Sequence, residues 1–259
     1  MREACRFAGN LLAILAVLWL SPARVSGEEI PFRAFQNWNF YNNTGWRYLY
    51  RGDYARAEER FKMAIAEIRP YPSGDQRLLA RSYADLARVL YHEGRYAEAE
   101  PLARWALSVR ESHPRVNPDA VFQSLYILAL IHLEQAHFAE SEALLRRALA
   151  MQEKIVGPMH VYTAATLDEL AGVCVRQKKF GDAEGLYKRA IAIHERRNPE
   201  MNPQLAEVDE HLASLLKQTN REEEAKHWEE RAKAIRDAMA AAAARARLDQ
   251  AVPGYRGFR

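Results

Sequence analysis

Hydrophobic and small residues recur along the chain at a constant interval of 42 residues. A leucine followed by an alanine is found at Leu86, Leu128, Leu170 and Leu212. An aromatic residue recurs at Tyr54, Tyr96, Phe138 and Phe180. An alanine recurs at Ala64, Ala106, Ala148, Ala190 and Ala232. Because these columns keep one period with no insertion, they predict an internal repeat.

A marker position divides each period into two expected helices. It is occupied by Gly52, Gly94, Ala136, Lys178 and Asn220. Glycine suits a turn between helices because it accepts positive φ. Small residues at fixed places let two helices approach closely, while leucine and aromatic side chains fill the space between them. One such pair has too little core to be stable, so the pattern predicts stacked pairs that share a continuous core.

The pattern resembles the tetratricopeptide repeat, or TPR, in its 42-residue kinesin-light-chain form. Tyr83–Leu107 reads YADLARVLYHEGRYAEAEPLARWAL, and Leu167–Ile191 reads LDELAGVCVRQKKFGDAEGLYKRAI. The segments Ser112–Ala120 and Gly157–Ala164 are similar to the family linker. The resemblance implies an all-α fold, a right-handed α-solenoid of about five helix-turn-helix repeats. The repeats are expected near residues 38–71, 80–113, 122–155, 164–197 and 206–236, within a solenoid that spans 38–236.

The end repeats depart from the pattern, as expected where an outer face must be soluble. Trp38, Tyr41 and Trp46 are interpreted as a cap on the first repeat. In the last repeat Glu222 replaces the aromatic residue and Asn220 the glycine. We expect residues 28–37 to form a lead-in, and residues 237–259 to form a helical extension with a basic tail.

The first 27 residues have the layout of a secretory signal peptide. Arg2 and Arg6 precede the apolar run Leu11–Leu20, and small residues follow up to Gly27. The run is short for a transmembrane helix, which needs about 20 apolar residues. We expect cleavage after Gly27, with Ala23 as the second choice, and a periplasmic or secreted protein. An uncleaved N-terminus that serves as a membrane anchor is the alternative.

Charge and cysteine content exclude few classes of function. The formal net charge is +3, from 37 basic and 34 acidic residues. Without residues 1–27 the counts become 34 and 33, so nothing in the composition calls for nucleic acid as a partner. Only Cys174 then remains, and one cysteine cannot form an internal disulfide. Its column faces the expected core, so burial is favoured over reactivity.

The sequence lacks the motifs of common active sites. It contains no H-E-x-x-H pair, no glycine-rich phosphate loop and no G-x-S-x-G elbow. We therefore expect no enzyme, no cofactor and no metal site. Acidic residues recur near the start of each second helix, and we interpret them as solvated faces that favour the helix N-terminus. They are Glu98, Glu100, Glu140, Glu142, Asp182 and Glu184.

By the resemblance, the first helices of the repeats line a concave groove that binds a protein or peptide. The candidate peptide-binding residues are Asn42, Trp46, Arg81, Arg88, Tyr91, Tyr126 and Arg176. Arg81 and Arg88 could hold a carboxylate through two parallel hydrogen bonds. The Trp and Tyr side chains are aromatic anchors of the kind that dominates interfaces. These residues could equally be ordinary groove surface.

Two functional hypotheses follow. The first is an exported scaffold or adaptor that binds a protein or peptide segment, with no nucleic acid and, after signal cleavage, no membrane as partner. The second is a structural or self-assembling subunit of a cell-envelope complex, driven by an apolar end face or tethered by a retained N-terminus. A homo-oligomer is left open.

Overall fold

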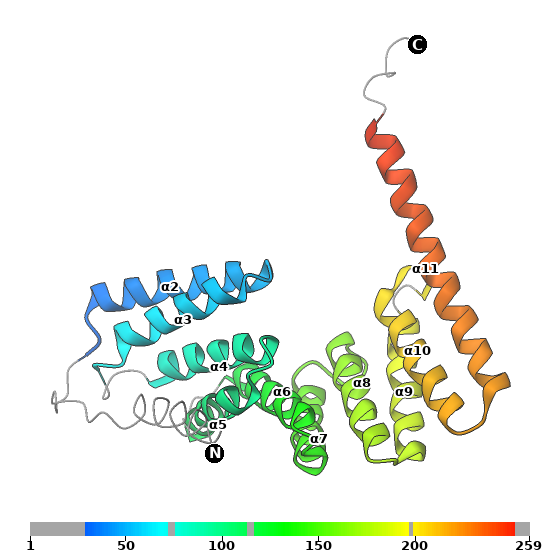
Figure 1. Cartoon of the computed structure of the whole chain (residues 1–259), viewed down its shortest axis with the longest axis horizontal. Coiled ribbons are helices and arrows are strands. Elements are labelled where there is room, and N and C mark those ends of the chain that lie inside the picture. The colour runs from blue at the N-terminus through cyan, green and yellow to red at the C-terminus, as the bar shows by residue number, and fades with distance from the viewer. Residues whose placement is uncertain (1–28, 72–75, 113–116, 197–198, 252–259) are drawn as a thin grey trace, which may run out of the picture. The chain divides into compact units, whose positions relative to one another are not determined.

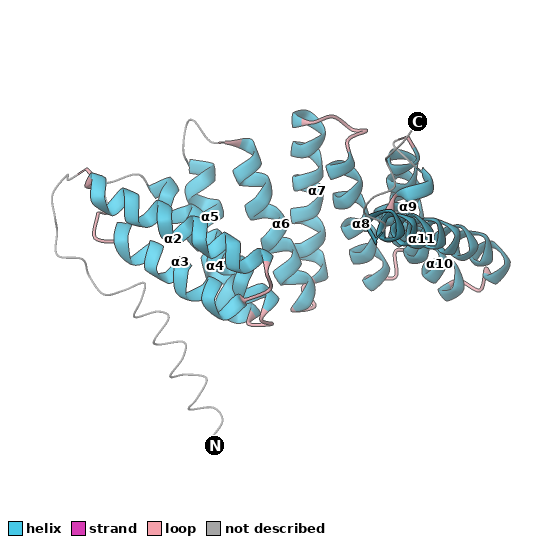
Figure 2. Cartoon of the chain, turned by 90° about the horizontal axis from the view of Figure 1, so that it is seen from above, coloured by secondary structure: helices cyan, strands magenta, loops and turns pink. Residues whose placement is uncertain are grey.

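The computed structural model describes residues 29–71, 76–112, 117–196 and 199–251 (Figure 1). Within these residues the chain forms ten α-helices and one 3-10 helix and no strand (Figure 2), which confirms the all-α prediction. None of the helices in the described ranges has the length and hydropathy needed to cross a membrane. The expected signal peptide, residues 1–27, lies outside the described residues.

The chain divides into two compact units after Ala136. The first unit contains α2 (Phe32–Tyr50), α3 (Tyr54–Ile68), α4 (Gln76–His92), α5 (Tyr96–Ser112) and α6 (Pro118–Glu134). Each of these helices packs against the next one along the chain, and α4 also contacts α6 (Figure 1). The unit is therefore built from consecutive helix hairpins in which first helices lie beside first helices.

The second unit repeats this arrangement. It contains α7 (Phe138–Ile155), α8 (Val161–Arg176), α9 (Phe180–Glu195), the 3-10 helix η1 (Pro199–Met201), α10 (Pro203–Gln218) and α11 (Glu222–Ala251). Consecutive helices again pack together, α8 contacts α10, and η1 lies against α11. With 30 residues, α11 is one continuous helix through the last repeat and beyond it.

All five marker residues adopt the left-handed conformation that was expected for glycine, including the three that are not glycine. Their φ angles are 73° and 75° at Gly52 and Gly94, and 61°, 62° and 60° at Ala136, Lys178 and Asn220. Two hydrogen bonds close the helix end at such a turn. At Gly94 the amide donates to the Tyr91 carbonyl at 3.0 Å, and the next amide donates to the Leu90 carbonyl at 2.8 Å. This is the Schellman arrangement, which satisfies the last carbonyls of a helix.

The columns of small residues lie at the closest helix contacts. Ala64, Ala106, Ala148, Ala190 and Ala232 are all buried. Gly45 in α2 shows how tight these contacts are, because a Cβ atom there would lie 2.7 Å from the Phe61 ring of α3. Larger side chains at these positions would force the paired helices apart.

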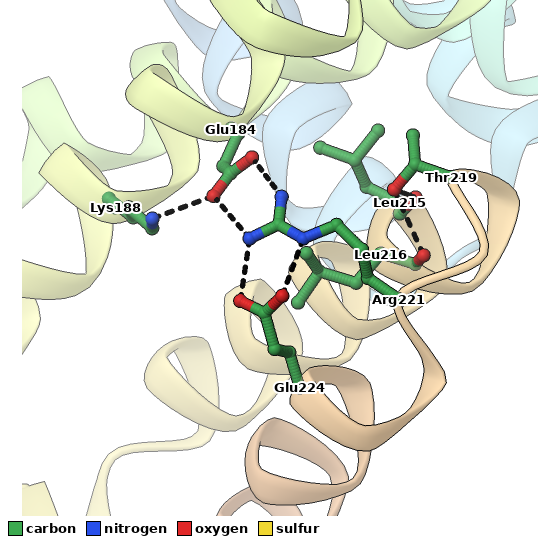
Figure 3. A network of polar contacts seen from close by, with 7 residues as sticks. All are labelled: Glu184, Lys188, Leu215, Leu216, Thr219, Arg221 and Glu224. Carbon is green, nitrogen blue, oxygen red and sulfur yellow. Dashed lines mark hydrogen bonds and ion pairs between the residues drawn. The ribbon is translucent and has the colours of Figure 1, made fainter.

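A polar contact between neighbouring repeats recurs with a spacing of 37 residues. A basic residue directly after the marker of one repeat reaches an acidic residue in the second helix of the preceding repeat. The pairs are Arg95–Glu58 at 2.9 Å, Lys179–Glu142 at 2.6 Å and Arg221–Glu184 at 2.7 Å. In Figure 3, Arg221 lies between Glu184 of α9 and Glu224 of α11.

Glutamine residues make similar contacts between neighbouring repeats. Gln177 donates to Glu142 at 2.9 Å, and Gln135 donates to Glu100 at 3.2 Å. Hydrogen bonds from Lys179, acting against partial burial, lower the pKa of Glu142 to about 2. The interpretation of Glu142 and Glu184 as solvated helix faces was therefore wrong: these carboxylates join successive repeats.

Candidate functional site

A cavity of about 540 Å³ opens between first helices of the first unit. Its lining comes from α2, α4 and the start of α6, with one residue from α5. The lining residues are Trp46, Tyr50, Arg77, Leu78, Arg81, Asp85, Arg110, Asn117, Asp119, Ala120 and Gln123. We call this cavity the arginine pocket, because three arginines and two aspartates are among its lining residues.

Asp85 is the most buried charged residue of the pocket wall, with 5% of its surface exposed. Its Oδ2 atom accepts hydrogen bonds from Trp46 Nε1 at 3.0 Å and from Asn42 Nδ2 at 3.4 Å, and Arg81 Nε lies 3.9 Å away. One carboxylate oxygen of Asp85 thus fixes two neighbouring side chains of α2.

Burial dominates the electrostatics of Asp85. Loss of solvent raises the pKa of its carboxyl group, and the positive charges of Arg81, Arg88 and Arg110 offset this only in part. Burial likewise lowers the pKa of Arg110. Arg110 donates to the Ala120 carbonyl at 2.7 Å and to Ser124 Oγ at 2.6 Å, so it fastens α5 to α6. Its guanidinium group is part of the pocket wall rather than a free donor.

A chain of hydrogen bonds continues from Asp85 along the contact between α2 and α4. Trp38 Nε1 donates to Ser82 Oγ at 2.8 Å, and Ser82 Oγ donates to Asn42 Oδ1 at 3.3 Å. Both tryptophans of α2 are therefore held by polar groups of α4. Trp38 is buried against Ala64 and Ile68. The interpretation of Trp38 as an outer cap was wrong, because its ring points into the core of the unit.

Arg81 and Arg88 lie against the tryptophan rings. The Arg81 guanidinium carbon is 5.8 Å from the Trp38 ring centre, and that of Arg88 is 5.7 Å from the Trp46 ring centre. The Arg81 side chain is 49% exposed and lines the pocket. Arg88 is half-buried, and its Nε atom has no partner among the described residues. Of the two, Arg81 is placed to receive a ligand carboxylate in the pocket.

The candidate residues from the sequence fall into three groups. Asn42, Trp46, Arg81 and Arg88 surround Asp85, although Asn42 is buried. Tyr91 contacts the rings of His92 and Tyr96, and Tyr126 stacks on Phe122, so these tyrosines belong to aromatic clusters outside the pocket lining. Arg176 belongs to the second unit, where its guanidinium lies 5.4 Å from the Phe138 ring centre.

The candidate set missed Asp85, Arg77, Arg110 and Tyr50. A signal for Asp85 was present, because an acid stands in α4 between the buried neighbours Ala84 and Leu86. Arg110 gave no such signal, since a second helix was not expected to reach the pocket. Its contact with Ser124 depends on how α5 meets α6.

The second unit contains two further polar features. His211 Nδ1 lies 2.9 Å from Asp168 Oδ1, and this hydrogen bond raises the pKa of His211. Cys174 is fully buried, and burial raises the pKa of its thiol, so it has the character of a core residue. In the parts of the chain that the structure describes, no group of three His, Cys, Asp or Glu side chains could hold a metal ion.

Comparisons with known proteins identify the repeat. The profile of the tetratricopeptide repeat matches residues 41–112 and 121–196. Among the curated proteins, no match was found. Solved structures with the same fold are numerous, and three illustrate their range.

BtubC (BKLC) from P. vanneervenii is 19% identical with a TM-score of 0.65, over 88% of this chain and 94% of that chain. TPR-like repeats from Podosopora anserina that carry the name of a kinesin light chain are 20% identical with a TM-score of 0.65, over 76% and 93%. A Rap protein complexed with Competence and Sporulation Factor is 18% identical with a TM-score of 0.64, over 79% and 55%. With the repeat profile, the recurring marker turns and these structures in agreement, the chain belongs to the tetratricopeptide repeat family.

Proposed function

We propose that this TPR protein is a non-catalytic scaffold that holds an acidic protein or peptide segment in the arginine pocket. The repeat fold supports a role in protein–protein interaction, and a Rap protein of the same fold is known in complex with Competence and Sporulation Factor. The observation that carries the proposal is Arg81. Its half-exposed guanidinium lines a cavity of about 540 Å³, and its contact with Asp85 is long, at 3.9 Å.

The chemistry of the pocket favours a carboxylate beside an apolar or aromatic side chain. A guanidinium group binds a carboxylate through two parallel N–H···O bonds. Trp46 and Tyr50 offer aromatic surface next to Arg81, and aromatic side chains bury much area at little entropic cost. A basic segment would meet Arg77 and Arg81 and be repelled.

Panning of a displayed library of random 12-residue peptides tests this proposal. The wild-type chain is expected to enrich peptides that contain Asp or Glu next to an aromatic residue. The variant Arg81→Glu should lose these peptides. Arg104→Glu is the matched control, because Arg104 is an exposed arginine of the same unit that also pairs with an acid one turn away and lies outside the pocket lining. Enrichment of the same acidic peptides on Arg81→Glu would overturn the proposal.

We further propose that the protein acts outside the cytoplasm after removal of residues 1–27. The basic start, the apolar run Leu11–Leu20 and the small residues before Glu28 support this proposal. Intact-mass measurement of the protein from its native cells tests it. A mass that begins at Glu28 is the expected result. A mass that includes the whole apolar run would instead favour the anchored alternative.

A further inference from the structure

Arg81 and Asp85 lie one turn apart on α4 and line the same cavity. The Arg81 Nε atom is 3.9 Å from Asp85 Oδ2, and the two side chains are 49% and 7% exposed. A guanidinium group carries five N–H donors in one plane. One edge of the Arg81 group therefore faces a buried carboxylate of the protein, while its exposed part lines the cavity in which the acidic segment is proposed to bind.

Every helix packed around Asp85 contributes polar or charged groups to its surroundings. These groups are Trp46 and Asn42 on α2, Arg77, Arg81 and Arg88 on α4, Arg110 on α5 and Asp119 on α6. With its three arginines and Asp119 ionised, the lining of the cavity carries a formal charge of +2 while Asp85 is protonated and +1 once Asp85 is ionised. The protonation state of Asp85 thus changes the charge that a ligand meets.

Arg81 is the group that most favours the ionised form of Asp85. Burial raises the pKa of the Asp85 carboxyl group, and the positive charge of Arg81 is the largest of the effects that oppose burial. A ligand carboxylate bound to Arg81 would neutralise this charge and bring a second negative charge into the cavity. Two carboxylates that share one site disfavour each other's ionised form. The bound ligand is therefore expected to favour the protonated form of Asp85.

Protonation of Asp85 is compatible with the hydrogen bonds of the pocket wall. Trp46 Nε1 and Asn42 Nδ2 both donate to the same oxygen, Oδ2. A carboxylic acid that carries its proton on the other oxygen still accepts hydrogen bonds at this one. Trp46 thus keeps its place beside Arg81 in both protonation states. The change of state alters the charge of the cavity and preserves the contacts that shape it.

We propose that Asp85 takes up a proton from solvent when an acidic segment binds at Arg81, a role that rests on the function proposed above. Proton binding and ligand binding are then linked, and linkage between two sites is reciprocal. The affinity for the acidic segment therefore rises as pH falls, for as long as the carboxylate of the segment itself stays ionised. A glutamate in a peptide has a pKa of about 4.3, so it is ionised from pH 9 down to pH 5.5.

Calorimetric titration of the full chain at pH 5.5 and at pH 9 tests the proposal. The probe is the acidic peptide most enriched on the wild-type chain, made with blocked ends and chosen without histidine, cysteine or lysine. The wild type is expected to bind this peptide about tenfold more tightly at pH 5.5 than at pH 9. Asp85→Asn should bind it with similar affinity at both pH values, because the amide resembles the protonated acid. Histidines elsewhere in the chain titrate in both proteins, so the comparison removes their effect.

Asp119→Asn is the matched control. This variant also removes one aspartate from the lining of the cavity, but at an exposed position at the start of α6. Its affinity for the peptide should keep the same ratio between pH 5.5 and pH 9 as in the wild type, because a solvated carboxylate is not the group that takes up the proton. Loss of the pH dependence in Asp119→Asn together with its retention in Asp85→Asn would contradict the proposal.

Proton uptake by the wild type keeps the test valid if Asp85→Asn does not fold. Titrations between pH 5.5 and pH 9 in two buffers with different heats of ionisation give the number of protons bound together with the peptide. We expect a net uptake of up to about one proton. Equal affinity at all pH values without proton uptake would overturn this proposal and leave the proposed function standing. If the peptide bound at no pH, both proposals would be wrong.

Discussion

The indole nitrogen of Trp46 donates a hydrogen bond to Oδ2 of Asp85 at 3.0 Å. This contact joins the first helices of two successive repeats at the wall of the arginine pocket. It holds the aromatic surface of Trp46 in place and keeps a buried carboxylate beside Arg81. The proposed function depends on this arrangement, because a preorganised pocket spends less of its binding free energy on ordering side chains.

Asp85→Asn is expected to change stability in a pH-dependent way. Burial raises the pKa of Asp85, so the folded chain binds the proton more tightly than the unfolded chain. The stability of the wild type therefore falls as pH rises through the interval between the unfolded and folded pKa values. Asn resembles the protonated acid and removes this loss. At pH 7 we therefore expect the variant to be more stable than the wild type.

Urea unfolding from pH 4 to pH 8 measures this difference. The gap between Asp85→Asn and wild type should widen as pH rises, whereas Asp237→Asn, at an exposed position of α11, should follow the wild type throughout. A gap that is constant with pH would show that the ionised carboxylate of Asp85 carries no cost.

Two glycine-to-alanine changes inside first helices should act in opposite directions. In Gly45→Ala the new methyl group would lie 2.7 Å from the Phe61 ring, and we expect a loss of about 1–3 kcal/mol. Gly172→Ala in α8 meets nothing within 4 Å, so the helix should gain about 0.5–1 kcal/mol. Thermal unfolding of both variants checks the signs. If both variants changed stability equally, the close contact between α2 and α3 would not be the reason for a glycine at position 45.

The marker turns make a prediction that depends on backbone conformation alone. Lys178 has φ 62°, a conformation that costs a side chain with a Cβ atom about 1–2 kcal/mol. Lys178→Gly should therefore stabilise the chain by about 0.5–1 kcal/mol, after the greater entropy of glycine in the unfolded chain is subtracted. Gly94→Ala, at φ 75° with open space around its Cα, should destabilise it. Denaturant midpoints compare the pair, and the reverse order would contradict the assigned turns.

Glu142 should control part of the acid sensitivity of the second unit. Hydrogen bonds from Lys179 and Arg146, against partial burial, lower its pKa from 4.5 to about 2. The stability this carboxylate provides is complete above pH 4.5 and is lost as pH falls toward 2. After allowance for solvent screening we expect a contribution of about 1–2 kcal/mol.

Acid titration of Glu142→Gln checks this contribution. The variant should be less stable than the wild type at pH 7, and the two curves should converge as pH falls below 4.5. Glu223→Gln is the control, because Glu223 pairs with a lysine on the exposed surface of α11. Curves that stay parallel down to pH 2 would show that Glu142 is not held ionised by Lys179.

The sequence predicted the repeat because one short-range requirement recurs in every copy. Small residues at close contacts and a left-handed residue at each turn are needed wherever two helices form a hairpin. That requirement holds even where the marker is Ala136 or Lys178, since φ is positive there too. The turn therefore follows from the position within the 42-residue repeat and not from the type of residue at the marker.

The polar contacts between repeats were less predictable. Glu142 and Lys179 are 37 residues apart, and their meeting depends on the angle at which one hairpin packs on the next. The partners of Asp85 were hidden for the same reason, because Trp46 and Asn42 come from the preceding repeat. Candidate residues chosen by position within a single repeat could not separate the pocket wall from the aromatic clusters of Tyr91 and Tyr126.

A charge-exchange binding experiment tests the central claim most directly. The acidic peptide most enriched on the wild-type chain, and the same peptide with its acid replaced by lysine, are titrated by calorimetry into wild type and Arg81→Glu. We predict that Arg81→Glu binds the acidic peptide at least about tenfold more weakly and binds the lysine peptide better than the wild type does. The contrary result is that Arg81→Glu binds the lysine peptide no better than the wild type does. The acidic segment then does not bind at Arg81.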